Sequence, residues 1–296
     1  MGRERRFVDL HTHSTASDGT TRPAEVVRLA DAAGMAAVAL TDHDTVAGLG
    51  EARAAAAALP DLRLIPGIEV SARFPPPAMV HLLGLGIDED SQALGDLMAE
   101  FRAAREERNP KVLARLQALG VPLDMDDVRA AAAAVGGEPI DPATPRILGR
   151  MHIAEAMRRK GLVASAREAF DRYLGEGGPA YVEKDRLRPG EVIRRLKAAG
   201  AAAVLAHPAH LHLEGRLDLE RAVREMMDAG LEGIEVYHSD HNDEQTRMYL
   251  DLARKLNLLV TGGSDFHGQT KPTVRLGHPR VPLAAITGQW ADRWLR

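Results

Sequence analysis

The chain has 296 residues, a net charge of −4, no cysteine and 45% hydrophobic residues. This size and composition exclude a disordered chain and fit one large domain, or one domain with an insertion. The lack of cysteine excludes disulfides and thiolate metal sites. No run of about 18 apolar residues occurs, so no membrane span is predicted. The basic N-terminus lacks the apolar stretch of a signal peptide, which predicts a cytoplasmic protein. The negative charge argues against stable binding of long nucleic acid.

Seven short apolar runs predict strands at residues 7–11, 36–40, 63–69, 79–85, 202–206, 233–237 and 258–261. Helical patterns follow most of them. The first helix begins at Pro23 and ends at Gly34, and later ones cover 48–59, 190–199, 216–229 and 242–256. Most of the strands lack polar alternation, which indicates a parallel sheet that is buried on both faces. The predicted fold class is α/β, a distorted seven-stranded (β/α) barrel.

The alternation of strands and helices breaks between residues 90 and 183. Helical patterns at 91–107, 111–119, 125–134, 145–159 and 164–173 predict an all-helical insertion. We therefore expect a barrel domain of residues 1–89 and 184–296, and an insertion of residues 90–183 that lies near the barrel mouth as a lid or substrate wall. Its first helices carry a row of basic residues that we interpret as a solvent-exposed face: Arg102, Arg105, Arg108, Lys111 and Arg115.

Residues able to bind metals stand at or just after the predicted strands, where parallel barrels present catalytic side chains. His11 and His13 are two residues apart on an extended segment, so both can reach one ion. Imidazole and carboxylate ligands without sulfur suit Zn, Mn or Fe. The sequence predicts a multinuclear metal site formed by His11, His13, Asp18, His43, Glu69, His81, His207, Asp265 and His267.

Several of these residues have a structural alternative when each is considered alone. Asp18 fits a turn, His43 a helix cap and His81 a core histidine. Glu69 is harder to explain in that way, because an unpaired buried carboxylate is costly. The strongest signals are the two pairs at His11/His13 and Asp265/His267. Taken together, the motifs favour a metal site over separate structural roles.

In this order, the motifs resemble those of the polymerase and histidinol phosphatase family, usually called PHP. The resemblance covers nearly the whole chain and implies a trinuclear metal phosphoesterase on a seven-stranded barrel. Asp18 is a point of variation, because some members have His there. The resemblance implies one metal held by His11, His13, Glu69 and Asp265, a second by Glu69, His81 and His207, and a third by Asp18, His43 and His267.

Four further residues are candidates for contacts with the substrate. Arg150 and His152 resemble an Arg-Pro-His segment in the branch of the family that acts on nucleotide phosphates, although Met151 replaces the proline. Both could donate to phosphate oxygens, and the alternative is a helix start that faces solvent. His238 follows the sixth strand and is a candidate proton donor or phosphate ligand, with an ordinary loop histidine as the alternative. Lys184 is a weaker substrate-binding candidate.

The pattern predicts a phosphoesterase in which a metal-bridging hydroxide attacks phosphorus in line. The chain resembles the 3′,5′-nucleotide bisphosphate phosphatases and 5′–3′ exonucleases of the family. The expected substrate is therefore a small phosphorylated nucleotide or a short oligonucleotide. One alternative is a histidinol-phosphate phosphatase, and another is a polymerase-associated or regulatory binding module. Such a module should have lost ligands, yet all nine are present. An amidohydrolase would not need the third set of ligands.

Overall fold

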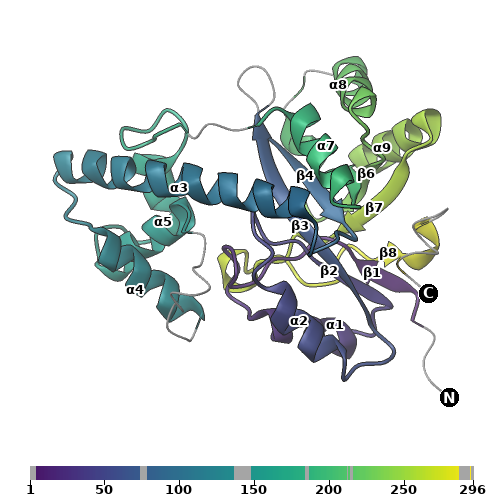
Figure 1. Cartoon of the computed structure of the whole chain (residues 1–296), viewed down its shortest axis with the longest axis horizontal. Coiled ribbons are helices and arrows are strands. Elements are labelled where there is room, and N and C mark those ends of the chain that lie inside the picture. The colour runs from purple at the N-terminus through teal and green to yellow at the C-terminus, as the bar shows by residue number, and fades with distance from the viewer. Residues whose placement is uncertain are drawn as a thin grey trace.

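A curled sheet of eight strands forms the centre of the molecule, and helices lie outside it (Figure 1). The computed structural model describes residues 5–73, 79–136, 148–183, 187–211, 213, 216–286 and 294. The strands lie in the order β7-β6-β5-β4-β3-β2-β1-β8. Their bounds are β1 (Phe7–Asp9), β2 (Ala37–Leu40), β3 (Arg63–Arg73), β4 (Met79–Leu85), β5 (Ala202–Leu205), β6 (Gly233–His238), β7 (Leu259–Gly263) and β8 (Val281–Pro282).

The barrel nearly closes where the chain after β1 meets the end of β7. The Leu10 amide donates to the Gly262 carbonyl at 3.0 Å. A Cβ atom at Gly263 would lie 2.4 Å from both N and Cβ of His11, so only glycine permits this approach. Beyond the strands, the Asp265 amide donates to the His11 carbonyl at 2.9 Å. The two segments that carry the strongest metal-binding motifs are thus fixed side by side.

All seven predicted strands are present, but the expected parallel sheet is wrong at β4. This strand runs antiparallel to both β3 and β5. Only five residues separate β3 from β4, and a parallel crossover needs a dozen or more. The number of strands also differs, because the two-residue β8 pairs antiparallel with β1. A strand of two residues is too short to give a sequence pattern.

Five helices, together with the first half of α3 (Gln92–Ala118), cover the outer face of the barrel. One apolar layer lies between the helices and the strands, and a second fills the barrel. The five helices are α1 (Pro23–Ala32), α2 (Leu49–Ala56), α7 (Pro189–Ala198), α8 (Arg216–Asp228) and α9 (Asp243–Leu256). Val38 and Ile234 pack in the outer layer under the helices, while Leu83 and Val204 fill the barrel interior. Among the described residues, no helix is both long and apolar enough to cross a membrane.

A long helix, α3 (Gln92–Ala118), links the barrel to a group of helices beside it (Figure 1). This group contains α4 (Met125–Gly136), α5 (Arg150–Arg159) and α6 (Ala166–Ala169), which continues into a π turn (Phe170–Leu174). The first half of α3 packs against the barrel through Leu97, whereas its second half packs through Leu116 in a separate apolar cluster. The helix continues through exposed Pro110, where two helices were expected. Where the chain is described between residues 90 and 183, it forms helices and turns without strands.

Candidate metal centre

The side chains that were predicted to bind metals gather at one end of the barrel. Strands β1, β2, β3, β5, β6 and β7 run toward this end, so the residues at or after their last positions reach it. Strand β4 runs the opposite way, and His81 reaches the same end because it stands near the start of the strand. The barrel mouth therefore holds His11, His13, Asp18, His43, Glu69, His81, His207, Asp265 and His267.

One group consists of His11, His13, Glu69 and Asp265, all buried. Nε2 of His13 lies 3.2 Å from Glu69 Oε2 and 3.2 Å from Asp265 Oδ1. Nε2 of His11 lies 3.4 Å from the same Glu69 oxygen. Four potential ligand atoms thus point into one small space, as the resemblance implied.

The other carboxylate oxygen of Glu69 faces a second group. Glu69 Oε1 lies 2.8 Å from His81 Nδ1 and 3.0 Å from His207 Nε2. The two histidine nitrogens are 3.2 Å apart. Glu69 therefore stands between two sets of ligand atoms, which is the position expected of a carboxylate that bridges two ions.

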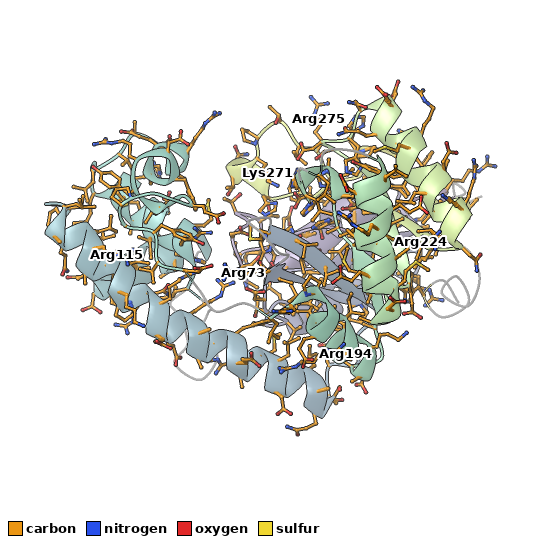
Figure 2. All side chains as sticks on the ribbon, turned by 90° about the horizontal axis from the view of Figure 1, so that it is seen from above. Arg73, Arg115, Arg194, Arg224, Lys271 and Arg275 are labelled. Atoms are coloured by element: carbon orange, nitrogen blue, oxygen red, sulfur yellow. The ribbon has the colours of Figure 1, made fainter. Side chains whose placement is uncertain are left out.

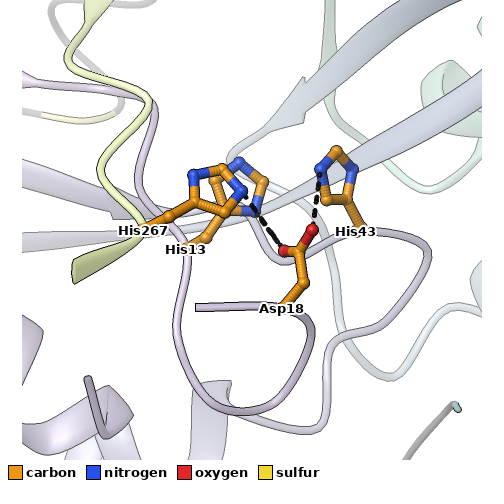
Figure 3. Close-up of side chains that lie close together, drawn as sticks. All are labelled: His13, Asp18, His43 and His267. Atoms are coloured by element: carbon orange, nitrogen blue, oxygen red, sulfur yellow. Dashed lines mark ion pairs between the residues drawn. The ribbon is translucent and has the colours of Figure 1, made fainter. Parts of the chain in front are cut away.

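Asp18 is the centre of a third group (Figure 3). Its oxygens lie 3.2 Å from His267 Nε2 and 3.8 Å from His43 Nε2. His13 approaches Asp18 as well, at 3.9 Å. The predicted third set is thus brought together, and His13 stands between it and the first group.

Unpartnered polar atoms test whether these groups fit a metal. In the described part of the chain, His11 Nε2, both ring nitrogens of His13 and Glu69 Oε2 are buried without a hydrogen-bond partner. Leaving such atoms unpartnered is costly, and a cation would satisfy them. The ring of His11 is also oriented for this purpose. Its Nδ1 donates to the Glu235 carboxylate at 3.1 Å, which leaves the Nε2 lone pair facing the group.

The charges of the cluster suit a cation too. Burial alone would raise the pKa of Glu69, but His43, His81 and His11 hold it well below its usual range. Burial lowers the pKa of His207 to about 3. Burial would also lower the pKa of His43, but the negative charges of Glu69 and Asp18 raise it to about 10. The carboxylates are therefore ionised, and a bound cation can replace the proton on His43.

Two more histidines, His238 at the cluster and His152 in α5, have a defined ring tautomer. His238 Nδ1 accepts from the Asp240 amide at 3.1 Å, so the ring proton of the neutral form is on Nε2, 3.5 Å from Asp265 Oδ2. His152 Nδ1 accepts from the Gly149 amide at 3.0 Å, which likewise places the proton on Nε2. His238 and His152 are thus donors at Nε2 in this arrangement.

A cavity of about 200 Å³ opens beside the cluster, and we call it the arginine pocket. One side belongs to the barrel mouth and the other to α3 and α5. The barrel side contains Asp18, His43 and His81, and the helical side contains Arg105, Arg108, Arg150 and His152. The three guanidinium groups outnumber the two carboxylates of the pocket, Asp18 and Asp44, and this surplus of positive charge favours anions.

The interpretation of the basic row on α3 as a solvent-exposed face is wrong for two of its residues, Arg105 and Arg108. Arg105 forms an ion pair with buried Asp44. Arg108 is buried and donates to Asn109 Oδ1 at 2.9 Å. The interpretation holds for the remaining members of the row, which are exposed: Arg102, Lys111 and Arg115 (Arg115 is labelled in Figure 2).

Arg150 lies at the first position of α5 and belongs to both the pocket and the helical group. Its guanidinium donates to the Leu174 carbonyl at 2.9 Å. It also lies 5.6 Å from the Phe170 ring centre and 5.2 Å from that of Tyr181. These contacts fix the orientation of the guanidinium at the pocket wall. Lys184 lies outside the described residues.

Comparison with known proteins identifies the family. The profile described as PHP domain matches residues 9–183. The chain belongs to the PHP domain family. A 5′–3′ exoribonuclease of Haemophilus influenzae is 33% identical over 88% of this chain and 89% of its own length. A 3′,5′-nucleoside bisphosphate phosphatase of Chromobacterium violaceum is 34% identical over 92% of this chain and 90% of its own.

A solved structure has the same fold as this PHP protein. It comes from Bifidobacterium adolescentis and is described as a candidate metal-dependent phosphoesterase. The TM-score is 0.80 at 31% identity, and the match covers 95% of this chain and 97% of the other. The expected family, barrel fold and phosphoesterase branch are therefore confirmed.

Sequence reasoning missed two charged residues of the PHP site. Glu235 is fully buried and accepts from His11 and from the His207 amide, the latter at 2.8 Å. It stands in an apolar strand, so the argument applied to Glu69 could have found it. Lys271 lies on the barrel (Figure 2) and donates to Asp265 Oδ2. It follows β7 in a stretch without periodic pattern, and no sequence signal distinguishes it.

Proposed function

We propose that this PHP protein is a metal-dependent phosphoesterase that hydrolyses 3′,5′-nucleotide bisphosphates to a nucleoside 5′-monophosphate and phosphate. We also propose that it shortens 5′-phosphorylated oligonucleotides. The observation that carries this proposal is the arginine pocket at the edge of the metal-binding cluster. A pocket with three arginines suits a substrate that bears a second phosphate besides the one to be hydrolysed. The relatives named for these two activities support the same substrate class.

The proposed cofactors are three divalent ions, Mn, Fe or Zn. The ligands are those that the resemblance implies, and the unpartnered atoms of His11, His13 and Glu69 support the assignment. When bound, such ions supply the positive charge that activates water and stabilises the developing charge on the phosphate oxygens. Short substrates fit the chain better than long nucleic acids, because its net charge is −4.

The protein's own side chains would orient the substrate and move a proton. Arg105, Arg108 and Arg150 would hold the 5′-phosphate, and His152 Nε2 would donate to it. His238 Nε2 faces the cluster and would give a proton to the leaving 3′-oxygen. Burial lowers the pKa of His238, but Glu235 and Asp265 more than offset this and raise it. A raised pKa favours the protonated ring, as a proton donor requires.

We further propose that residues 90–183 form a lid domain over the barrel mouth. The helices of this segment have their own apolar cluster, which includes Leu116 and Ile153. They also supply the outer wall of the arginine pocket. A substrate in this pocket would touch both the barrel and the helical segment, so the segment would contribute to substrate binding.

The test is a comparison of three substrates with protein reconstituted separately with Mn²⁺, Fe²⁺ and Zn²⁺. We expect kcat/KM for 3′-phosphoadenosine 5′-phosphate to exceed that for histidinol phosphate and p-nitrophenyl phosphate by about ten- to hundredfold, the contribution of one charge-assisted contact to the second phosphate. A preference for histidinol phosphate would reject the nucleotide assignment. If none of the three substrates is hydrolysed with any of the three metals, the assignment as a phosphoesterase is rejected.

A further inference from the structure

A second cavity, of about 450 Å³, adjoins the arginine pocket. The two cavities share Ser17, Asp18, Met151 and His152, so they meet at the edge of the metal-binding cluster. The barrel side of the second cavity is the loop of residues 15–20 together with residues 269–270. Its other side is α5 and the turn that leads into α6. The proposed activity on bisphosphates leaves this cavity without a role.

Hydrogen bonds fix both walls of the second cavity. On the barrel side, the Gln269 amide donates to Thr20 Oγ1 at 2.7 Å and joins the two loops. On the helical side, Ser165 Oγ accepts from the Glu168 amide at 3.1 Å, and the Ala164 amide donates to Glu168 Oε2 at 2.7 Å. The cavity is therefore formed in advance, as ligand sites usually are.

The lining of the second cavity differs in charge from that of the arginine pocket. Its two arginines face carboxylates: Arg158 pairs with Glu155 at 2.7 Å, and Arg167 lies 3.7 Å from Asp171. The remainder consists of Asp18, Met151 and His152, of hydroxyl and amide groups, and of the methyl groups of Ala132, Ala164 and Ala166. Such a surface has no surplus of positive charge for phosphate. It suits a neutral group with both polar and apolar parts, such as a ribose with its base.

We propose that the second cavity binds the nucleoside that lies beyond the scissile phosphate of an oligonucleotide. This inference rests on the proposed function. The 5′-terminal nucleotide would occupy the arginine pocket, the scissile phosphate would lie at the cluster, and the second nucleoside would pass Asp18 into the second cavity. Water then adds to phosphorus, the P–O3′ bond breaks, and the 3′-oxygen leaves with a proton. The phosphate remains on the 5′-oxygen of the second nucleotide. A 3′,5′-bisphosphate has no second nucleoside, so it does not use the cavity.

The test fills the cavity and compares two substrates. Ala164 lies in the wall and is exposed, so Ala164→Trp narrows the cavity without disturbing the core. The measurement is the ratio of kcat/KM for 5′-phosphorylated diadenosine to that for 3′-phosphoadenosine 5′-phosphate. We expect this ratio to fall by about tenfold or more, the loss typical of removing the stacking and packing of one base. Ala130→Trp, on the exposed part of α4 away from both cavities, is the matched control and should leave the ratio at the wild-type value.

Each outcome is decisive for one of the two proposals. A wild-type protein that hydrolyses the bisphosphate but not the dinucleotide would overturn the assignment of the second cavity and retain the bisphosphatase. An unchanged ratio in Ala164→Trp would also overturn it, even if both activities fall together. If Ala164→Trp fails to fold, Gln269→Trp narrows the cavity from the opposite wall and should lower the ratio in the same way. A wild-type protein inactive on both substrates would reject the proposed function itself.

Discussion

Glu235 should control the affinity of the metal centre through its contact with His11. Its two oxygens lie 3.1 and 3.2 Å from His11 Nδ1, and Oε2 also accepts from the His207 amide at 2.8 Å. Glu235→Gln keeps the shape of the side chain but replaces one acceptor by a donor. Both oxygens contact His11 Nδ1, so in either orientation the new amide nitrogen faces this N–H, and the carboxylate charge that attracted it is gone. The His11 ring is then held less firmly and can turn or move its proton to Nε2.

The expected loss follows from the single charge-assisted bond that is removed. Such a bond contributes about 1.5–3 kcal/mol, which corresponds to about ten- to hundredfold weaker metal binding. Competition with a chelator measures this affinity directly. Glu232→Gln is the matched control, because Glu232 precedes the same strand and pairs with Lys197 on the outside of the barrel. Unchanged metal affinity in Glu235→Gln would show that His11 does not need this carboxylate, and equal losses in both variants would point to general destabilisation.

Three further predictions address the cluster and the pocket. Glu69→Gln should lose metal and activity together in a protein that remains folded, because Glu69 faces two groups of ligand atoms; full metal content by elemental analysis would contradict this. Arg150→Ala should lower kcat/KM for the bisphosphate by about ten- to hundredfold more than for p-nitrophenyl phosphate. Arg159→Ala, on the exposed end of α5, is the control and should leave kcat/KM for both substrates unchanged. An unchanged ratio of the two kcat/KM values in Arg150→Ala would mean that Arg150 only packs within the helical group.

The third prediction concerns the release of protons when the cluster binds metal. The pKa of His43 is raised from 6.5 to about 10, so its proton stabilises the metal-free fold fully below pH 6.5, and this contribution is lost as the pH rises through about 10. Metal binding should therefore release protons and strengthen with pH, which calorimetry in buffers of different ionisation enthalpy measures; binding without proton release would contradict it.

The strand ends could be predicted from the sequence because each combines a short apolar run with a residue type that binds metals. His43 and His207 are found in this way, and the barrel brings them to one mouth because their strands run in parallel. Glu235 lies inside β6 rather than at its end, so this rule does not find it, although the cost of an unpaired buried carboxylate indicates it as it does Glu69. The geometry of the site was thus largely contained in local patterns.

The arginine pocket could not be predicted in the same way. Arg105 and Arg108 lie on a helix whose apolar face changes partner along its length, from the barrel at Leu97 to the helical cluster at Leu116. A periodic pattern shows which residues face a core, but it does not show where a polar face meets a second body. The pairing of Arg105 with Asp44 joins residues 61 positions apart, and no local signal predicts it.

The antiparallel β4 explains how the centre acquires its second group of ligand atoms. In a purely parallel barrel, the fourth strand would bring its last residue, Leu85, to the mouth. Because β4 is reversed, its third residue, His81, reaches the mouth and pairs in register with Ser71 of β3. Glu69 stands two residues before Ser71 on the same face, within the diagonal reach of His81, and the two side chains meet at 2.8 Å. The short β3–β4 connection that breaks the parallel pattern is therefore the feature that places an imidazole beside the central carboxylate.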